Sequence, residues 1–451
     1  MAEVPRIAFA TLGCRLNQVE SDELAALATQ AGYRVVEAAD PAEVYVVNTC
    51  TVTARADASD RQAIRRLRRE RPGALLVATG CYAETQPAAL GSMSELDLVV
   101  GNRDKYRLLE LIGRGRRPGE GPARPDAHGT TPAGELRMLA APEAAAPLGL
   151  APLGRSRAFV KIQDGCQHRC AFCIVPTARG ASRSRAVDQV VAQVESLVAA
   201  GHAEVTLTGV DIGHFGWDLQ PRTTLAALIG RLADVSGLRW LRLSSILPAY
   251  FTPELVEAVT GSPVVAPHLH VPLQSGSDAV LRAMRRPYNG ALYRRVVERL
   301  AEGIPGLGLG TDAIVGHPGE GEPEFAETLS LVQELPFSYL HVFAYSDRQG
   351  TEAAGMAGRP AAGEVRDRSR RLRALGDEKA AAFRRGLLGR AHDALVLDAR
   401  DPLTGRLTAL TGNFVEIALD GPAALARRIV RVRLDSLEGP RPVGVLEQEA
   451  A

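Results

Sequence analysis

The chain has 451 residues, of which 46% are hydrophobic and 23% are charged, and this length predicts several domains rather than one core. The net charge of +1 neither indicates nor excludes nucleic-acid binding, because a balanced chain can still carry a local basic face. We find no secretory signal pattern and no apolar run of about eighteen residues, so we expect no membrane partner and a cytoplasmic location.

Residues 4–113 alternate short apolar runs with helical patterns, which predicts a domain built on a largely parallel sheet. The strand-like runs cover residues 7–13, 44–50 and 75–81. Three cysteines lie at the ends of these runs: Cys14, Cys50 and Cys81. Because functional groups of such sheets gather beyond the carboxyl ends of the strands, we expect the three cysteines to meet there.

The rest of the chain divides by composition and rhythm. Residues 114–156 are rich in Gly, Pro and Ala without periodicity, which predicts a linker. Strand–helix alternation returns in residues 157–383 with about six units, and favours a partial or full barrel with its site at the strand ends. A long arginine-rich helix is expected at 364–389. Short strands separated by turns in residues 384–447 are typical of a small antiparallel β-barrel. The expected fold class is therefore α/β with this added barrel.

The remaining cysteines form a tight second triad: Cys166, Cys170 and Cys173. This C-x₃-C-x₂-C run places three thiolates on one loop after a strand, where they can cap one face of a cluster. A fully protein-ligated cubic iron–sulfur cluster takes four cysteines, so a triad leaves one iron open for another ligand. Zinc is the alternative metal, although structural zinc sites usually take four protein ligands. The dispersed triad is weaker on its own, because free cysteine is commonly a small buried hydrophobe.

With its flanks, GCQHRCAFCIVPTARG, the tight triad resembles the radical S-adenosylmethionine (SAM) superfamily, which the spacing and Phe172 match. The resemblance implies that SAM chelates the open iron and is cleaved to a 5′-deoxyadenosyl radical. His168 is then expected to be a solvated loop residue rather than a ligand. Other candidates for SAM contact lie at strand ends, where the alternative is an ordinary turn or cap: Gly209, Val210, Gln274, Ser275 and Asp312.

Together, the two triads narrow the resemblance to the methylthiotransferases, and it covers nearly the whole chain. The segments TLGCRLNQVESD, VVNTCTVTARAD and KIQDGCQHRCAFCIVP look most like the branch that acts on N6-threonylcarbamoyladenosine in tRNA. The resemblance implies two [4Fe-4S] clusters, a radical SAM partial barrel at 157–383 and an auxiliary cluster on Cys14, Cys50 and Cys81 that carries the sulfur. Three residues depart from the pattern that we expect of this branch: Leu247, Arg285 and His317.

Two regions are candidates for RNA contact. The helix expected at 59–71 carries a run of arginines: Arg61, Arg65, Arg66, Arg68 and Arg69. A charge run is usually a solvated face, but arginines beside the cysteines would position an RNA through its phosphates. The C-terminal barrel looks like a TRAM domain, an RNA-binding module. The expected partners are a tRNA anticodon stem-loop, whose unpaired bases can be splayed out, and an electron donor such as flavodoxin or ferredoxin.

The leading hypothesis is therefore a radical SAM transferase that adds a 2-methylthio group to threonylcarbamoyladenosine at position 37, next to the anticodon. One alternative is a methylthiotransferase with another target, either isopentenyladenosine in tRNA or a ribosomal-protein aspartate. The other alternative comes from a different class, a non-catalytic RNA-binding protein whose triads hold structural metal.

Overall fold

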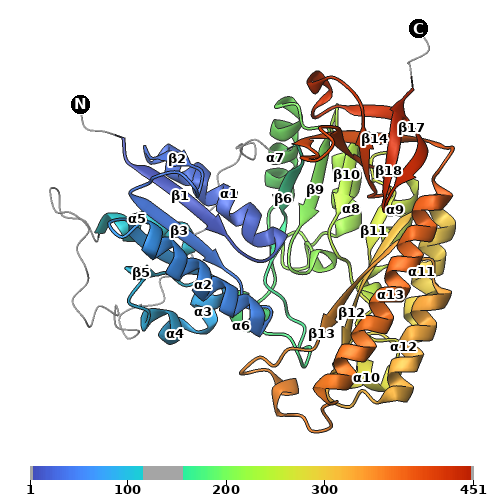
Figure 1. The fold of residues 1–451 in the computed structure, drawn as a ribbon, viewed down its shortest axis with the longest axis horizontal. Coiled ribbons are helices and arrows are strands. Elements are labelled where there is room, and N and C mark those ends of the chain that lie inside the picture. Colours follow the sequence, from blue (N-terminus) through green and yellow to red (C-terminus); the bar gives the residue numbers. More distant parts are fainter. Residues whose placement is uncertain (1–3, 115–155, 448–451) are drawn as a thin grey trace.

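The computed structural model describes residues 4–114 and 156–447, and the linker predicted at 114–156 lies almost wholly outside them. Three sheet systems follow one another along the chain, as Figure 1 shows from blue through green and yellow to red. This arrangement confirms the α/β class with a C-terminal barrel. No described helix is long and apolar enough to cross a membrane.

The N-terminal sheet has five parallel strands in the order β2-β1-β3-β4-β5. Its strands are β1 (Arg6–Thr11), β2 (Arg34–Val36), β3 (Val44–Thr49), β4 (Leu75–Gly80) and β5 (Leu98–Val99). Its helices are α1 (Arg15–Gln30), α2 (Ala54–Glu70), α3 (Cys81–Thr85), α4 (Pro87–Gly91) and α5 (Leu108–Arg114), with a 3₁₀ turn at Lys105–Arg107. Alternate residues of β3 face opposite cores: Tyr45 packs with Ile64 of α2, and Val46 packs with Ala28 of α1. The sheet is therefore covered on both faces.

Six parallel strands form the central partial barrel. They are β6 (Ala158–Lys161), β9 (Glu204–Thr208), β10 (Trp240–Leu243), β11 (His268–His270), β12 (Gly308–Val315) and β13 (Tyr339–Ala344). Two three-stranded sheets, β10-β9-β6 and β11-β12-β13, are joined by a single parallel bridge between Leu241 and Val265. The helices outside the strands are α7 (Val187–Ala199), α8 (Leu225–Ala233), α9 (Pro253–Gly261), α10 (Asp278–Ala283), α11 (Gly290–Gly303) and α12 (Glu322–Glu334). The main hydrophobic core lies between these strands and helices.

Shorter elements surround the first barrel strand and the later loops. A small hairpin pairs β7 (Gln163–Asp164) with β8 (Arg183–Ser184), and α6 (Val175–Arg179) lies between its strands. The 3₁₀ turns are Ile212–His214, Pro248–Tyr250, Glu352–Gly355 and Ala423–Leu425. The long arginine-rich helix is α13 (Ala362–Gly386), which begins two residues earlier and ends three residues earlier than the sequence predicts.

The C-terminal barrel is closed by five strands in the order β14-β15-β16-β18-β17. They are β14 (Ala391–Arg400), β15 (Leu407–Thr411), β16 (Glu416–Leu419), β17 (Ile429–Glu438) and β18 (Arg441–Leu446). Its pairs are antiparallel, as expected, except that β16 and β18 run parallel where the barrel closes. The connection between these two strands passes through β17, so they meet in the same direction.

The turn between β15 and β16 closes the end of the partial barrel at which the strands begin. The ring of Phe414 stacks on the imidazole of His268 with 4.2 Å between ring centroids. Arg242 donates from Nη1 to the Gly412 carbonyl over 3.0 Å. A Cβ at Gly308 would lie 2.0 Å from the Asn413 carbonyl oxygen, so only glycine permits this approach. The opposite end, where the strands finish, remains available for a site.

Candidate cluster and cofactor site

The tight triad occupies the loop between β7 and α6. The backbone N–H of Cys166 donates to Gly180 over 3.0 Å, and that of Cys173 donates to Cys170 over 3.1 Å. The loop is also tied to distant segments, because Ala171 donates to Met284 (3.0 Å) and accepts from Ala353 (2.8 Å). The three thiols are therefore held on a loop with fixed ends, at the carboxyl side of the first barrel strand.

The thiols of the tight triad are poorly solvated. Burial raises the pKa of Cys166 to about 12 and that of Cys173 to about 11. Arg286 donates from Nη1 to the sulfur of Cys170 over 3.1 Å. A buried thiol ionises only when a nearby positive charge, such as a metal, offsets the loss of solvation. Three thiols on one loop form a donor set that fits a metal cluster.

The dispersed triad lies at the carboxyl edge of the N-terminal sheet. Cys14 stands at the N-cap of α1, Cys50 follows β3 directly, and Cys81 begins α3. Gly13 has φ +91°, and a Cβ there would lie 2.6 Å from the sulfur of Cys50, so the glycine lets the Cys14 and Cys50 loops touch. Burial, together with the neighbouring Cys14 and Cys81, raises the pKa of Cys50 to about 11. The structure thus brings the three thiols together, as the sheet topology predicts.

One buried arginine connects the two triads. Arg179, the last residue of α6, is 3% exposed. Its Nη2 donates to Oδ1 of Asn17 over 2.8 Å, and that oxygen lies 3.9 Å from the sulfur of Cys14. Burial raises the pKa of Cys81, whereas Arg179 and Lys105 oppose that rise. A side chain from the tight-triad loop therefore reaches the dispersed triad.

Arg179 belongs to a buried ion network centred on Glu20 of α1. Arg179 donates to Glu20 Oε1 over 2.8 Å, Lys161 of β6 donates to the same oxygen over 3.1 Å, and Lys105 bonds the other oxygen. Glu20 is fully buried, and burial alone would raise its pKa. The three cations instead hold that pKa well below the usual range. The network therefore joins the N-terminal domain to the partial barrel through buried charges.

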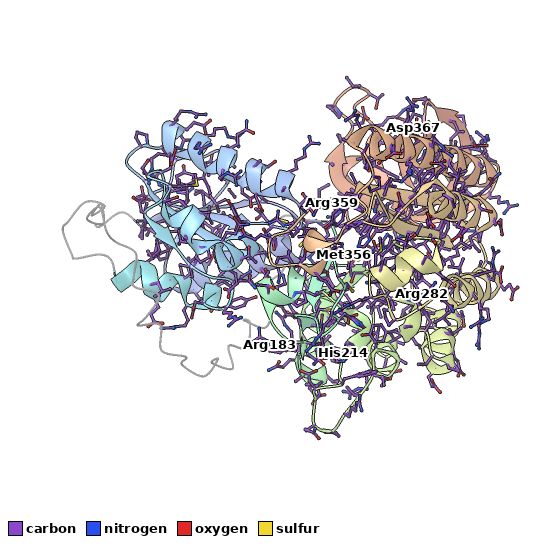
Figure 2. The ribbon with its side chains drawn as sticks, turned by 90° about the horizontal axis from the view of Figure 1, so that it is seen from below. Arg183, His214, Arg282, Met356, Arg359 and Asp367 are labelled. Atoms are coloured by element: carbon purple, nitrogen blue, oxygen red, sulfur yellow. The ribbon has the colours of Figure 1, made fainter. Side chains whose placement is uncertain are left out.

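A second arginine fastens the Cys50 loop. Arg348, which is 4% exposed, donates to Oδ2 of Asp57 over 2.7 Å and also bonds the hydroxyl of Thr51. In the same segment, Ser346 accepts from the backbone of Ala54 over 3.1 Å. Figure 2 shows that the part of this segment labelled at Met356 and Arg359 lies between the N-terminal domain and the barrel. Both cysteine regions are thus held to the barrel by segments far apart in sequence.

The residues predicted to contact SAM have mixed surroundings. The Phe172 ring meets His317 edge-on, with 6.4 Å between centroids. Gly209 and Val210 directly follow β9. Gln274 has φ +67°, and its N–H donates to the Asp312 carbonyl over 2.8 Å. Ser275 is fully buried, with its hydroxyl 3.2 Å from that of Thr328, so its side chain serves the fold.

Two groups near the tight triad were not singled out by the sequence. Tyr250 donates to Oδ2 of Asp211 over 2.8 Å, and this carboxylate lies 3.9 Å from the sulfur of Cys166. His168, expected to be solvated, is instead half-buried and lies 2.9 Å from the Tyr250 hydroxyl. Neither Asp211 nor Tyr250 carries a spacing signal, so only the folded chain reveals them.

The five arginines predicted to face RNA divide into two groups. Arg68 is used inside the domain, where it bonds Asp97 and donates to the carbonyls of Glu95 and Ala74. Arg61 donates to the Tyr82 hydroxyl over 2.7 Å. The remaining side chains are exposed on α2: Arg65, Arg66 and Arg69. A phosphate contact is therefore open to these three, and Arg68 is already committed.

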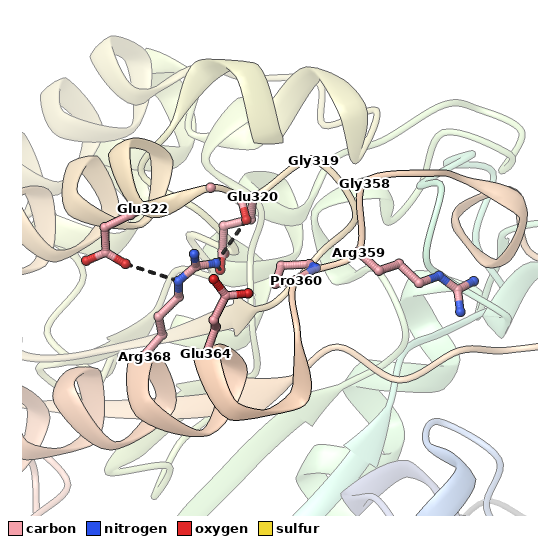
Figure 3. Close-up of a pocket in the computed structure, with 9 residues that line it drawn as sticks. Gly319, Glu320, Glu322, Gly358, Arg359, Pro360, Glu364 and Arg368 are labelled. Atoms are coloured by element: carbon pink, nitrogen blue, oxygen red, sulfur yellow. Dashed lines mark hydrogen bonds and ion pairs between the residues drawn. The ribbon is translucent and has the colours of Figure 1, made fainter.

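A separate cavity of about 600 Å³ lies between the loop after β12 and the start of α13 (Figure 3). Two arginines line it: Arg368 is bonded to Glu320 and Glu322 at 3.1 and 3.3 Å, and Arg359 is paired with Asp347. None of the residues predicted for clusters or SAM lines it. We therefore place the candidate site at the two cysteine triads and not in this cavity.

Comparison with known proteins matches both cysteine regions. A family model described as "Radical SAM superfamily" covers residues 160–332, and "Uncharacterized protein family UPF0004" covers residues 6–101. The chain is 36% identical over 431 residues to "Threonylcarbamoyladenosine tRNA methylthiotransferase MtaB" of Bacillus subtilis, covering 95% of this chain and 93% of that protein. It is 38% identical over 420 residues to "tRNA-2-methylthio-N(6)-dimethylallyladenosine synthase" of Sorangium cellulosum, covering 89% and 83%.

Among solved structures, the chain resembles a radical SAM methyltransferase, TsrM, from Kitasatospora setae, which was solved with cobalamin and a [4Fe-4S] cluster bound. The TM-score is 0.57 at 18% identity, over 78% of this chain and 77% of that one. At this identity the likeness shows a shared fold only.

Proposed function

The chain belongs to the radical SAM methylthiotransferase family, and on that basis we propose that it adds a methylthio group to C2 of N6-threonylcarbamoyladenosine 37 in tRNA. The observation that carries the proposal is the pair of incomplete cysteine triads, joined through Arg179 and fitting two clusters with one open iron each. This two-triad layout suits a reaction in which one centre generates a radical and the other provides sulfur.

The residues present fit two [4Fe-4S] clusters. Cys166, Cys170 and Cys173 hold one, and Cys14, Cys50 and Cys81 hold the other; all six cysteines of the chain are then used. When bound, the first cluster with SAM supplies a carbon-centred radical, and the second supplies the sulfur. Burial of Cys50 and Cys81 keeps water from these two ligands, and Arg286 orients Cys170 through its 3.1 Å hydrogen bond. Arg179 holds the edge of the dispersed triad against the tight-triad loop.

The substrate and partners follow from the same placement. Arg65, Arg66 and Arg69 are exposed on α2, the helix that follows the Cys50 loop, and contact RNA phosphates without reading sequence. The C-terminal barrel adds a second RNA contact. The target base lies in the single-stranded anticodon loop, from which it is splayed toward the strand ends. A flavodoxin- or ferredoxin-type donor delivers the electron, and the reaction takes place in the cytoplasm.

Mass spectrometry of tRNA nucleosides tests the proposal. A deletion strain should lose 2-methylthio-threonylcarbamoyladenosine and accumulate its unmethylthiolated precursor, and the wild-type gene should restore the product. A Cys81→Ala gene serves as the matched control and should not restore it. Unchanged product in a deletion strain without a second such enzyme contradicts the proposal.

The alternatives give different signatures in the same strains. A dimethylallyladenosine enzyme would change that nucleoside instead, and a ribosomal-protein enzyme would leave tRNA unchanged and alter the mass of one ribosomal protein. A non-catalytic protein would bind zinc after anaerobic reconstitution and would not cleave SAM. About eight irons per chain, with SAM cleaved on reduction, would exclude that last reading.

A further inference from the structure

Three polar side chains meet on the inner wall of the partial barrel: His270 of β11, Asp312 of β12 and His341 of β13. These strands lie side by side in Figure 1, and Asp312 is directly paired with His341 in the sheet register. Their sequence neighbours Leu269 and Ala313 belong to the hydrophobic core under the outer helices. Since side chains alternate across a strand, the three polar groups face the inside of the barrel.

The carboxylate of Asp312 lies between the two imidazoles. Its Oδ1 is 3.2 Å from Nε2 of His270 and 3.1 Å from Nδ1 of His341. Burial alone would raise the pKa of Asp312, but the two histidines hold it well below the usual range. Asp312 in turn raises the pKa of His341, which favours the charged imidazolium. The cluster therefore presents an ionised carboxylate beside a histidine that readily carries positive charge.

The cluster can accept a further partner. His270 is 92% buried, since its exposure is 8%, and its Nε2 meets Asp312 at 3.2 Å without good hydrogen-bond geometry. The other nitrogen of His270 is fixed 2.7 Å from the Ser245 hydroxyl, which sets the direction of the ring. The His341 side chain is 57% exposed, so it is open to a ligand. A buried nitrogen whose near partner is poorly aligned is unusual in a folded protein and can take a better-placed partner.

We propose that His270, Asp312 and His341 bind the polar substituent on N6 of the target adenine, and so select threonylcarbamoyl over dimethylallyl adenosine. This inference rests on the proposed function and names the part of the chain that chooses its substrate. It assigns Asp312 to the substrate, whereas the sequence predicted a SAM contact for it.

The chemistry of the two substituents separates them at this wall. A threonylcarbamoyl group carries urea N–H donors, a carbonyl, a hydroxyl and a carboxylate, which match Asp312 as acceptor and His341 as donor. A dimethylallyl group offers neither donor nor acceptor, and would displace water from the exposed His341 without replacing its hydrogen bonds. The lost hydrogen bonds give the selectivity.

The depth of the cluster suits this role. Asp312 is three residues before Val315, the last residue of β12, so it lies about 10 Å below the strand end at about 3.3 Å per residue. In adenine, C2 and C6 flank N1, and N6 is attached to C6. An adenine with C2 at the strand ends can therefore extend its N6 substituent down the inner wall. The exposed ring of Phe343, two residues further along β13, lies on the same face and offers apolar contact to the base.

The test uses reconstituted full-length enzyme and synthetic anticodon stem-loops that carry threonylcarbamoyl or dimethylallyl adenosine at position 37. Wild type should prefer the first RNA. His341→Ala should lower kcat/KM on that RNA on the order of 100-fold, less than the ~10⁴ of a fully buried polar site, and should leave the second RNA nearly unchanged. Ser245→Ala, which only frees the His270 ring, should give a smaller loss. Glu298→Ala, on the exposed side of α11, is the control and should keep the full preference.

The outcomes separate the two proposals. If wild type acts on neither RNA, the proposed function fails. If wild type prefers the threonylcarbamoyl RNA and His341→Ala keeps that preference, only the role of the cluster is overturned. Cleavage of SAM without RNA reports folding, and an equal loss there would also overturn the proposal. One zinc per chain that disappears in His341→Ala would make the cluster a metal site instead and likewise overturn it.

Discussion

The two cysteine triads reach similar chemistry by different routes. The tight triad is contained in residues 166–173, on a loop closed by its own backbone bonds. The dispersed triad is assembled from three strand ends, and charged side chains from another domain support it. A local site survives changes elsewhere in the chain, whereas an assembled site depends on every contact that aligns its parts. The dispersed triad should therefore be the more easily damaged of the two.

The largest effects are expected when the cysteines themselves are replaced. Cys170→Ala removes a proposed ligand of the tight triad, and we expect neither SAM cleavage nor methylthio product. Cys81→Ala removes a proposed ligand of the dispersed triad, and we expect SAM cleavage to continue at close to the wild-type rate while product is absent. Chromatography of 5′-deoxyadenosine and of RNA nucleosides measures both. If both variants fail to cleave SAM, the triads do not have separate roles.

The next largest effect is expected at Arg179. Arg179→Gln leaves Glu20 with less counter-charge in a fully buried position, and losing one partner of a buried pair costs about 3–5 kcal/mol. The iron content of the dispersed triad alone can be measured in a background that carries Cys166→Ala, Cys170→Ala and Cys173→Ala. In that background, we expect Arg179→Gln to lower the iron content by more than half.

Arg185→Gln is the matched control, because Arg185 bonds Glu23 in the same interface but has no bond to Asn17 beside Cys14. It should lower the thermal unfolding midpoint and leave the iron content close to that of the background. Equal iron loss in the two variants would mean that the network acts through stability alone.

A smaller effect is expected at Arg348. Arg348→Lys keeps the charge but moves it away from the position where Nη2 bonds both Thr51 and Asp57, which costs on the order of 1–3 kcal/mol. The Cys50 loop should loosen, and alkylation of Cys50 in apo protein should become faster, as peptide mass spectrometry can show. Arg359→Lys, at an exposed pair with Asp347, should leave the rate unchanged. An unchanged alkylation rate in Arg348→Lys would show that the Cys50 loop keeps its conformation without the Arg348 contact.

The smallest effect concerns acid. The pKa of Glu20 is lower in the folded protein than its ordinary value of 4.5, so its stabilising contribution is present above that value and is lost as the pH falls below it. Between about pH 5 and pH 3, the thermal unfolding midpoint of apo protein should fall more for wild type than for Glu20→Gln. Parallel curves would show that the cations do not hold Glu20 ionised.

The sequence predicted the strands and helices better than the side-chain contacts between distant segments. The strand runs ending at Cys14, Cys50 and Cys81 are confirmed because buried parallel strands are apolar and end at turns, and the fold class is confirmed with them. The ligand roles of these cysteines and the domain boundaries stay predictions. Arg179 and Arg348 gave no signal, because their partners lie more than a hundred residues away and only packing brings them close. Arg68 looked like its exposed neighbours because a charge run does not reveal which member turns inward.

The stacking of Phe414 on His268 has a practical consequence for dissecting the chain. Phe414 holds φ +70°, Asn413 donates to Gly306 over 3.2 Å, and both belong to the C-terminal barrel. The C-terminal barrel therefore closes one end of the radical SAM domain and is also a candidate RNA-binding module. A truncation before Leu387 would remove Phe414 and expose His268 to solvent. Loss of activity in such a fragment could follow from the disrupted radical domain and would not show a loss of RNA binding. Point variants on the outer surface of the barrel therefore test RNA binding more directly.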